Sequence, residues 1–579
     1  MKAVHRDAAD RMRIPGERWW CVAMIAAIVI PLVISAIHLL VAVGDDYFPT
    51  SDWALLELRT GDVSEHLITM GPFSRFNWNH PGPLLFYLLF LPYKIFGSSS
   101  IGLHIGAVLI NAVTVVGCGL VAFRRGGLVV AVAVLVPLGL LIRALGPEVM
   151  SDPWNPHLPI IPLFLLFLLA WSVAVGDLWM APVGAAVASF TVQSHTGMMP
   201  LTVALAVVAC AVVCGRGLRS PTDARREYWK RVGTVGAISM AVVAVLWAPV
   251  VYGTLVVREG NLATLLRFFN SDRANPSVWR AFDVLGLQWG PRPEWITGAR
   301  GFDLVGDVLF GPRWWIAIGI IAVTAATAVA VKRRDWDTIW FAVLLIVGAA
   351  GSVYAITGVV VPIYPYIVRW TWVLGAALGV LVLLAAWTAV PVRARAKAIR
   401  PIAAAAVIAL ALLGVSTTVD ALGNGAPYEH EQLAEKGIAK GVLAALPPET
   451  NLVLVEDAGG TIAIPGLVIQ LVRHGIDVDV VPDQPRVFGF DRRPTAAKYQ
   501  TTLRVFAIDG NEAPATDGRL VARASRSRTR KEERSLNALI TILEKKPPSS
   551  DRDLLLRDLL AMRTRPTDGI EVYLIERAK

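Results

Sequence analysis

The feature that most constrains the fold of this 579-residue chain is a series of long apolar segments separated by short basic ones. Hydrophobic residues make up 55% of the chain and charged residues only 17%, so the chain is more apolar than an ordinary soluble domain. The segments predict an α-helical polytopic membrane protein with about 11 transmembrane helices, because a span needs roughly 20 apolar residues. The expected spans lie near residues 19–43, 101–123, 127–145, 157–175, 178–194, 197–214, 232–252, 312–331, 338–357, 366–390 and 401–420.

The basic residues between these segments set the expected orientation. They group at 124–125, 216–231, 332–334 and 393–400, and all four groups fall on one side of the membrane if these spans are correct. Lys and Arg are enriched in cytoplasmic loops. We therefore expect a multi-pass protein of the cytoplasmic (inner) membrane, with its N-terminus in the cytoplasm and its C-terminus outside. The net charge of +10 then reflects these loops and does not indicate nucleic acid as a partner.

The apolar run at 83–96 is short for a span. The charge pattern holds only if this run does not cross the membrane. It therefore predicts an interfacial helix at the outer surface.

The chain changes character after residue 420. Short apolar runs at 451–460, 475–483, 501–509, 518–525 and 569–577 predict strands, and helical patterns cover 461–475, 526–546 and 549–563. We expect two domains: a transmembrane domain at 1–420 and an extracytoplasmic soluble α/β domain at 421–579.

Two of the predicted outer loops carry candidate catalytic groups. The first has Asp45, Asp46 and Asp52, and the second has Glu148, Asp152, Asn155 and His157. Asp52 precedes a helical pattern, so it could instead be a helix N-cap.

Arg143, His195 and Arg369 lie near the outer ends of predicted spans. Ionisable groups in spans are costly, which makes them functional candidates. The arginines could instead reach lipid headgroups, and the histidine could be a packed core residue.

The segment GPFSRFNWNHPGPLLFYLL, residues 71–89, places polar groups directly before the short apolar helix. The candidates here are Arg75, Asn77, Trp78, Asn79 and His80. An aromatic belt at the membrane surface would explain the aromatic residues but would need neither Arg75 nor His80.

The order of these features resembles the GT-C superfamily of glycosyltransferases that use polyprenyl-phosphate sugars. This superfamily includes the lipid A aminoarabinose transferases, the protein O-mannosyltransferases and the actinobacterial arabinofuranosyltransferases. Asp52-Trp53 corresponds to the acidic motif after the first helix, with Trp in place of the second carboxylate. His80-Pro81-Gly82-Pro83-Leu84 corresponds to the motif that opens the interfacial helix, with an inserted Gly, and Asp152 corresponds to the acid of the second loop. FSRFNWNHPGP also resembles the loop of an actinobacterial group in this superfamily.

The resemblance implies a glycosyltransferase that moves a hexose or pentose from a polyprenyl-phosphate donor, by inverting displacement, to a cell-envelope glycan, lipid or protein. A carboxylate would take the acceptor proton, with Asp52 or Asp152 as the first candidates and Asp45 or Asp46 as the alternatives. The donor phosphate and sugar would be bound by residues from the loops and span ends, namely His80, Arg75, Asn79, Asn77, Trp78, Glu148, Asn155, His157, His195, Arg143 and Arg369.

No nucleotide or redox cofactor is implied, and no metal-binding motif is present. Asp45, Asp46 and Asp52 could nevertheless hold a divalent cation through oxygen ligands. Apart from the donor and acceptor, the expected partners are membrane lipids.

Two other functions remain open. A transporter or flippase for lipid-linked saccharides would place polar residues in the middle of several spans and show internal repeats. A non-catalytic scaffold for envelope glycans would tolerate substitution of every loop carboxylate.

Overall fold

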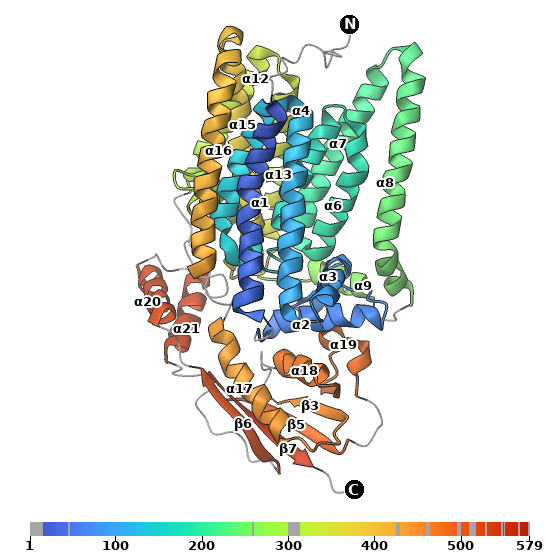
Figure 1. The fold of residues 1–579 in the computed structure, drawn as a ribbon, viewed down its shortest axis with the longest axis vertical. Coiled ribbons are helices and arrows are strands. Elements are labelled where there is room, and N and C mark those ends of the chain that lie inside the picture. The colour runs from blue at the N-terminus through green and yellow to red at the C-terminus, as the bar shows by residue number, and fades with distance from the viewer. Residues whose placement is uncertain are drawn as a thin grey trace.

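The protein consists of a bundle of long helices with a small sheet domain at one end, as seen in a computed structural model (Figure 1). The structure describes residues 16–44, 47–256, 260–298, 313–423, 429–458, 464–494, 499–508, 517–526, 530–545, 548, 550–564 and 568–576.

Eight helical segments in the described part of the chain are long and apolar enough to cross a membrane. This identifies a multi-pass membrane protein. Six of them each correspond to one labelled element: α1 (Glu17–Ala42), α4 (Ser100–Met150), α8 (Thr222–Val256), α12 (Trp315–Arg333), α13 (Trp336–Thr357) and α16 (Val392–Gly423). The other two add a short 3₁₀ or α-helical turn to α7 (Met199–Arg219) and to α15 (Trp372–Ala389).

Helix α4 is two antiparallel helices joined at Gly126 and Gly127. Gly127 has φ 63°, a left-handed conformation that glycine adopts without steric strain. The two halves lie side by side, because Asn111 Nδ2 donates to the carbonyl of Met150 at 2.8 Å. This hairpin matches the two spans that the sequence predicts at 101–123 and 127–145. Helices α5 (Ile160–Ala174) and α6 (Ala181–Ser194) have only 15 and 14 residues, so the total of eleven spans stays a prediction.

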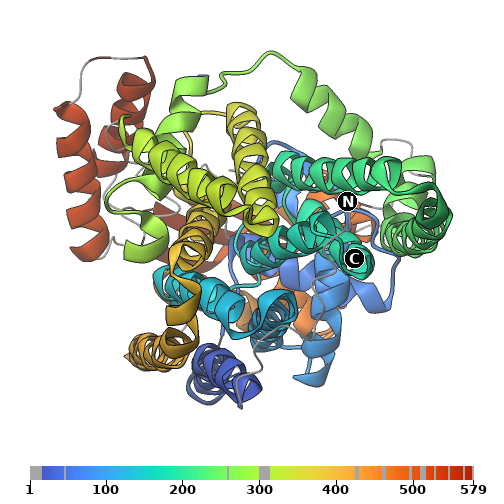
Figure 2. The same cartoon turned by 90° about the horizontal axis from the view of Figure 1, so that it is seen from above.

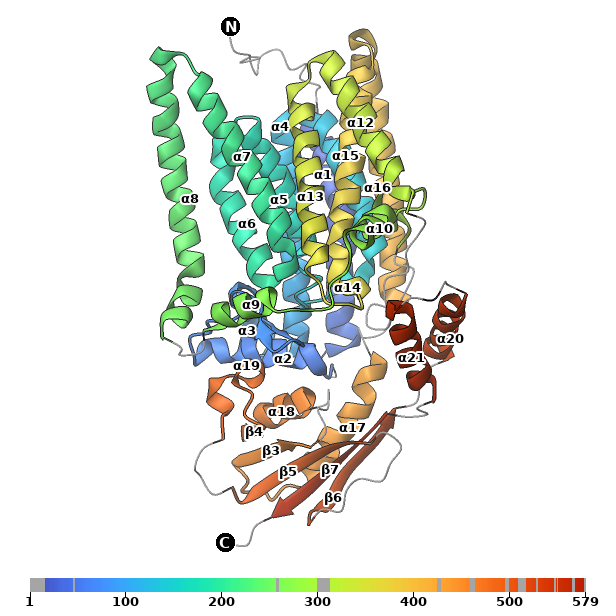
Figure 3. The same cartoon turned by 180° about the vertical axis from the view of Figure 1, so that it is seen from behind.

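Several short helices lie at the end of the bundle that faces the sheet domain (Figure 3). These are α2 (Ser51–Gly61), α3 (Leu84–Ile95) and α9 (Asn261–Asn270). Helix α3 is the 12-residue helix expected at 83–96. It packs against α2 and α4. The membrane part also contains α10 (Val278–Trp289), α11 (Glu294–Thr297) and α14 (Pro365–Val368). Figure 3 shows α10 partway along the bundle and α14 near the end that faces the sheet domain.

The two ends of the bundle have different polar groups. At the end where α1 begins, Arg124 binds Asp177, Arg125 binds Asp337 at 3.2 Å, and Glu17 accepts a hydrogen bond from the backbone of Leu128. The loops that we predicted to lie outside meet at the opposite end, beside the sheet domain (Figure 1). The predicted separation of basic loops from acidic and aromatic loops is therefore confirmed. The side of the membrane on which each end lies stays a prediction.

The C-terminal domain contains a five-stranded mixed sheet of order β4-β3-β5-β7-β6. Strand β3 (Leu452–Asp457) runs parallel to β4 (Asp477–Val481) and to β5 (Thr501–Ile508), so that Val455 lies opposite both Val480 and Leu503. Strand β7 (Asp568–Glu576) is antiparallel to β5 and to β6 (Arg519–Arg526).

The helices of this domain are α17 (Glu429–Ala445), α18 (Ile464–Arg473), α19 (Pro485–Phe488), α20 (Arg530–Glu544) and α21 (Ser550–Thr564). Figure 2 shows α20 and α21 beyond the outline of the bundle. The strands and the helices α18, α20 and α21 are those predicted from the sequence, whereas α17 was not predicted. The division at 420/421 stays a prediction, although α16 ends at Gly423, close to it.

Helices α18 and α19 of the C-terminal domain pack on α2. Phe48, Ala54, Leu55 and Leu58 belong to the same apolar core as the sheet domain. Two ion pairs reinforce this contact: Arg473 with Glu57, and Arg492 with Asp62. The C-terminal domain is thus fixed directly against α2, the helix that carries Asp52.

Candidate active site

The carboxylate of Asp52 points away from the end of its own helix. Helix α2 begins at Ser51, and the N-cap residue, Thr50, makes no side-chain capping bond. Asp52 instead accepts a hydrogen bond at 2.9 Å from the indole nitrogen of Trp154, in the second loop. The capping role that the sequence left open for Asp52 is therefore wrong.

Asp152 is bound in the reciprocal way. Trp53, the neighbour of Asp52, donates from its indole nitrogen to Asp152 Oδ1 at 2.8 Å. The backbone of Trp154 donates to the same oxygen at 2.9 Å, and His157 Nδ1 binds Asp152 Oδ2 at 2.7 Å. The two indole rings lie 5.2 Å apart between centroids. Each aspartate is thus held by the tryptophan next to the other, and two loops about 100 residues apart form one unit.

The surroundings shift the pKa values of Asp52 and Asp152 in opposite directions. Burial raises the pKa of Asp52 to about 6, against the lowering effect of the Trp154 hydrogen bond, and the nearby charge of Asp152 raises it further. Burial also acts to raise the pKa of Asp152, but the bonds from His157, Trp53 and the Trp154 backbone, with the His157 charge, bring it below its usual value. Asp152 is therefore a stable anion, whereas Asp52 titrates just below neutral pH, in the range suited to a general base.

His80 and His195 form a second pair beside the carboxylates. Their rings lie 5.2 Å apart. His80 Nδ1 accepts the backbone N–H of Thr196 at 3.1 Å, and His195 Nδ1 accepts that of Gly197 at 3.1 Å. Burial, followed by the effect of the other histidine, holds the pKa of His80 well below its usual value. Burial and the charge of His157 lower the pKa of His195 to about 4.

Both histidines are therefore neutral at physiological pH, with the ring proton on Nε2. They can act as neutral hydrogen-bond donors but not as cations. Asn155 connects them to the carboxylate pair, because its side chain donates to the carbonyl of Ser194 at 3.2 Å.

The segment before α3 is a tight turn, here called the 71–80 hairpin, with strands β1 (Phe73–Ser74) and β2 (Trp78–Asn79). Asn77 has φ 59° at the turn, a left-handed conformation that Asn tolerates better than most residues. Asn79 holds the hairpin in place: its side chain donates to the carbonyls of Gly71 and Arg486, and its backbone N–H donates to Asn261 at 3.0 Å. Trp78 is buried, with its ring 5.1 Å from that of His80.

Arg75 lies on the exposed side of the same hairpin. Its guanidinium carbon is 4.4 Å from the centre of the Tyr364 ring and 4.9 Å from that of Phe76, as in cation–π contacts. Arg369 is buried and lies 5.3 Å from the ring of Trp372. Its neighbour Trp370 lies close to Gly197, two residues after His195.

Two sequence candidates lie elsewhere. Arg143 binds Ser416 at 3.0 Å and Asp420 at 2.9 Å, on the flank of α16. Glu148 is exposed and lines an open cleft with Asp420 and Gly423 on that flank. The sequence places these residues at the correct height in the bundle, but height does not determine the direction in which a side chain points. Asp45 and Asp46 lie outside the described residues.

No group of three or more His, Cys, Asp or Glu side chains with the geometry of a metal site occurs among the described residues. Since Asp45 and Asp46 are not described, the divalent cation stays a prediction.

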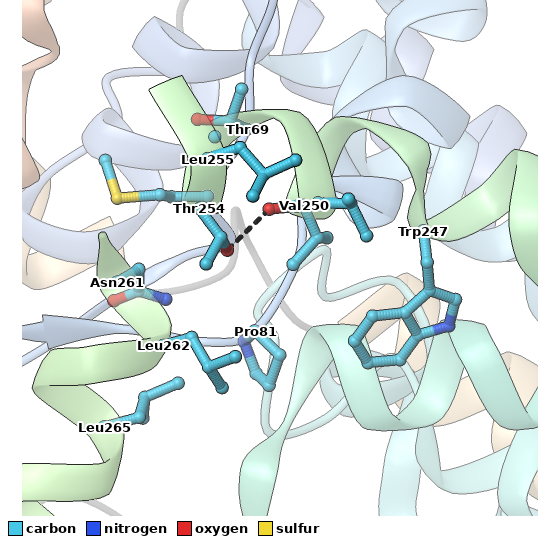
Figure 4. Close-up of a pocket in the computed structure, with 12 residues that line it drawn as sticks. Thr69, Pro81, Trp247, Val250, Thr254, Leu255, Asn261, Leu262 and Leu265 are labelled. Carbon is cyan, nitrogen blue, oxygen red and sulfur yellow. Dashed lines mark hydrogen bonds between the residues drawn. The ribbon is translucent and has the colours of Figure 1, made fainter. Parts of the chain in front are cut away.

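Two cavities border the 71–80 hairpin. The first, of about 200 Å³, lies between the end of α8, α9 and the chain on either side of the hairpin, and Figure 4 shows its mainly apolar side chains, among them Pro81, Trp247 and Leu265. The second is a crevice of about 10 Å³ between α2, the hairpin and α19. Asp52, Asn79 and Asn155 line it from the membrane domain, and Arg486 lines it from the C-terminal domain.

Sequence reasoning missed several residues of the site. Trp53 and Trp154 could be noticed only as neighbours of the aspartates, and nothing in the sequence pairs each with the distant acid. Thr196 and Arg486 carry no signal at all, because their contribution depends on contacts across 116 and 409 residues.

The helix bundle, the short helices across its end and the C-terminal sheet domain together have the GT-C fold predicted from the sequence. Among solved structures, the chain is similar to ArnT from Cupriavidus metallidurans bound to undecaprenyl phosphate, with a TM-score of 0.54 and 16% identity over 87% of this chain and 96% of that one. It is also similar to the apo state of the same protein, with a TM-score of 0.50 and 15% identity over 84% of this chain and 93% of that one. No protein-family model and no curated protein matches the sequence.

Proposed function

We propose that this membrane protein is a glycosyltransferase that moves a sugar from a polyprenyl-phosphate donor to an acceptor of the cell envelope. The observation that carries the proposal is the crossed pair of aspartates, in which Asp52 and Asp152 differ in acidity at the mouth of a GT-C bundle. The similarity to ArnT, one of whose structures holds undecaprenyl phosphate, supports a lipid-linked donor.

In this proposal Asp52 is the general base. It takes the proton of an acceptor hydroxyl while that oxygen attacks the anomeric carbon of the donor sugar. The bond from the anomeric carbon to the phosphate oxygen breaks, the polyprenyl phosphate leaves with the bonding electrons, and the anomeric configuration inverts. Asp152 is a positioning residue, because its three donors fix Trp53 and Trp154 around Asp52.

The phosphate would lie on the histidine side of the site. His80 and His195, being neutral, would donate hydrogen bonds from Nε2, and Arg369 and Arg75 would supply positive charge. The apolar cavity suits part of the polyprenyl chain because its wall is mainly apolar. It also lies next to the proposed phosphate site, since Asn261 in its wall donates hydrogen bonds to the carbonyls of Asn79 and His80.

A transporter for lipid-linked saccharides is less well supported. A substrate path through the membrane would need polar groups along the length of the bundle. The ionisable residues of the site described above, Asp52, Asp152, His80 and His195, instead lie at the end of the bundle next to the sheet domain. A buried polar group within the spans such as Asn111 serves the α4 hairpin instead.

The direct test is sugar transfer by the purified protein in lipid nanodiscs. Radiolabelled polyprenyl-phosphate hexoses and pentoses would be supplied with a membrane extract as the source of acceptor. We expect one donor to be consumed by the wild-type protein and none by the Asp52→Asn, Asp152→Asn double variant. Consumption of no donor, or equal consumption by the double variant, would reject the transferase.

The proposed orientation places the C-terminal domain outside the cell. A cysteine at the exposed Asp517, in a chain whose native cysteines are replaced, should react with an impermeant maleimide on intact cells. A cysteine at the exposed Thr222, at the other end of the bundle, should react only after permeabilisation. The reverse pattern would place the site in the cytoplasm.

A further inference from the structure

We infer that the helical hairpin formed by α20 and α21 lies on the membrane surface beside the bundle and binds the headgroups of anionic phospholipids. This surface would be a second attachment of the C-terminal domain, separate from its contact with α2. The inference is independent of the proposed function, because it concerns the lipid around the protein and not the substrates.

The α20–α21 hairpin is a unit of its own within the C-terminal domain. Among the described residues, its apolar core consists of side chains of these two helices, such as Leu539 and Leu559, and it is separate from the core of the sheet. Arg552 of α21 also donates to the carbonyls of Leu543 and Glu544 at the end of α20, at 3.0 and 3.2 Å. The hairpin therefore keeps its shape through contacts between its own two helices.

The position of the α20–α21 hairpin is the one expected of a segment at the lipid headgroups. Figures 1 and 3 show both helices at the height of α2, just beyond the end of α16, which is long and apolar enough to cross a membrane. Figure 2, seen along the bundle, shows the same two helices outside its outline. A segment at the height at which the spans end, but to the side of them, faces the lipid surface.

The α20–α21 hairpin also differs in charge from the domain that carries it. The segment between β6 and β7, residues 527–567, contains ten basic and six acidic side chains. The rest of the domain, at 421–526 and 568–579, contains thirteen basic and sixteen acidic ones. The sheet part is therefore net acidic, whereas the segment beside the membrane is net basic.

This difference in charge indicates the kind of lipid. Clusters of Lys and Arg next to a membrane are attracted to anionic headgroups, and the attraction falls off within a Debye length of the surface. A net basic segment that is level with the headgroups is close enough for this attraction, and the acidic sheet part would be repelled by the same surface. The α20–α21 hairpin is thus the part of the C-terminal domain that fits an anionic membrane.

The experiment measures how close α20 lies to the headgroups in the full-length protein. The native cysteines are replaced, and a bimane label is attached to a cysteine at Ala538, an exposed residue near the middle of α20. The protein is placed in nanodiscs of phosphatidylcholine, or of an equal mixture of phosphatidylcholine and phosphatidylglycerol. Both contain a small share of phosphatidylcholine with a nitroxide quencher on its headgroup. The control label is at Leu520, which is 44% exposed in β6, on the side of the sheet domain away from the bundle (Figure 1).

Two variants with opposite changes of charge separate lipid binding from folding. The first replaces by Gln the basic residues of α20 and of the position after it, Arg530, Lys531, Arg534 and Lys545. The second replaces by Gln the acidic residues of α20, Glu532, Glu533 and Glu544. An effect on the folding of the helix would change the quenching in the same direction in both variants, whereas an effect of charge would change it in opposite directions.

We expect quenching of the Ala538 label to be about twofold or more stronger in the mixed nanodiscs than in phosphatidylcholine alone, because each basic residue near an anionic surface adds to the attraction. The variant without the basic residues should lose this difference, and the variant without the acidic residues should increase it. High salt should reduce it, since salt shortens the range of the attraction. The Leu520 label should be quenched weakly in both lipids.

Three results would overturn the inference. The first is weak quenching of the Ala538 label in both lipids, as for a hairpin that faces water or binds another protein. The second is equally strong quenching in both lipids, which would place the hairpin at the membrane without a preference for anionic lipid. The third is a change in the same direction in the two charge variants. None of these results depends on sugar transfer, so the proposed function would be unaffected by any of them.

Discussion

Helix α2 carries two groups of carboxylates that differ in their partners. At its start, Asp52 is bound by an indole N–H, and its neighbour Trp53 binds Asp152. At its middle and end, Glu57 and Asp62 are bound by arginines of the C-terminal domain: Arg473 Nε lies 2.9 Å from Glu57, and Arg492 lies 2.8 Å from Asp62. Glu57 is 0% exposed and Asp62 5% exposed, whereas Asp52 is half-buried.

The difference lies in what neutralises the charge. A guanidinium cancels a carboxylate charge and leaves it unreactive, so the Glu57 and Asp62 pairs can only hold the two domains together. An indole supplies a hydrogen bond without a positive charge, which keeps the carboxylate of Asp52 basic. Carboxylates within eleven residues of one another therefore differ in role: Glu57 and Asp62 attach the C-terminal domain, and Asp52 is the proposed base.

The largest expected effect is on turnover, in Asp52→Asn. The rate of transfer should fall by about 100-fold or more, the usual contribution of a general base. Stability should not fall with it. Because burial raises the pKa of Asp52 to about 6, above the unfolded value, the ionised group destabilises the folded state at neutral pH, and Asn removes that cost. Transfer assays and thermal unfolding of one preparation measure both effects. A lower Tm would make Asp52 a structural residue like Glu57.

The matched substitution among the carboxylates that bind arginine is Glu57→Gln. It should weaken the attachment of the C-terminal domain, whereas Asp52→Asn should not lower stability. It leaves Arg473, which is 23% exposed, against an uncharged partner. Breaking a fully buried pair costs roughly 3–5 kcal/mol, and the partial exposure of Arg473 makes the expected loss smaller than that. We expect the C-terminal domain to be cleaved by protease much faster than in the wild-type protein. Ser100→Ala, which removes another hydrogen-bond partner of Glu57 but no charge, is the control and should have a smaller effect. Unchanged protease resistance would show that this ion pair does not attach the domain.

The smallest expected effect is a shift in pH dependence, in Trp154→Phe. The lost hydrogen bond stabilises ionised Asp52, so the pKa of Asp52 should rise further above about 6. The acid limb of the transfer rate should move up by about one pH unit, since one unit corresponds to 1.36 kcal/mol. Activity should therefore fall at pH 6.5 and recover at pH 8.5. Trp53→Phe should shift the limb less, because Asp152 keeps its bonds to His157 and the Trp154 backbone. No shift in Trp154→Phe would argue against Asp52 as the base.

Much of the fold is predictable because it follows from local patterns. Hydropathy places the long helices, the short α3 and the strands of the C-terminal domain, and the basic loops identify which loops share an end of the bundle. These are properties of consecutive residues, which the sequence states directly. The candidate loops of Asp52, Asp152, His80 and His195 could be grouped for the same reason.

The partners inside the site could not be predicted, because they depend on how helices are turned about their axes. Arg143 and His195 both lie near the outer ends of predicted spans, yet Arg143 faces Asp420 and His195 faces His80. Glu57 sits in the apolar run WALLEL and gives no sign that its partner is Arg473, 416 residues later. The neutral state of His80 could not be predicted either, because it follows from burial and from the backbone N–H of Thr196 that His80 Nδ1 accepts.

The crossed bonds between Trp53 and Asp152 and between Trp154 and Asp52 have a consequence for biosynthesis. The ribosome makes the first half of this unit about 100 residues before the second, and the arginines that anchor the C-terminal domain come some 400 residues later. During synthesis Asp52 therefore has neither its indole donor nor its protecting domain. A nascent or truncated chain would therefore lack these contacts, and the site could assemble only after translation is complete.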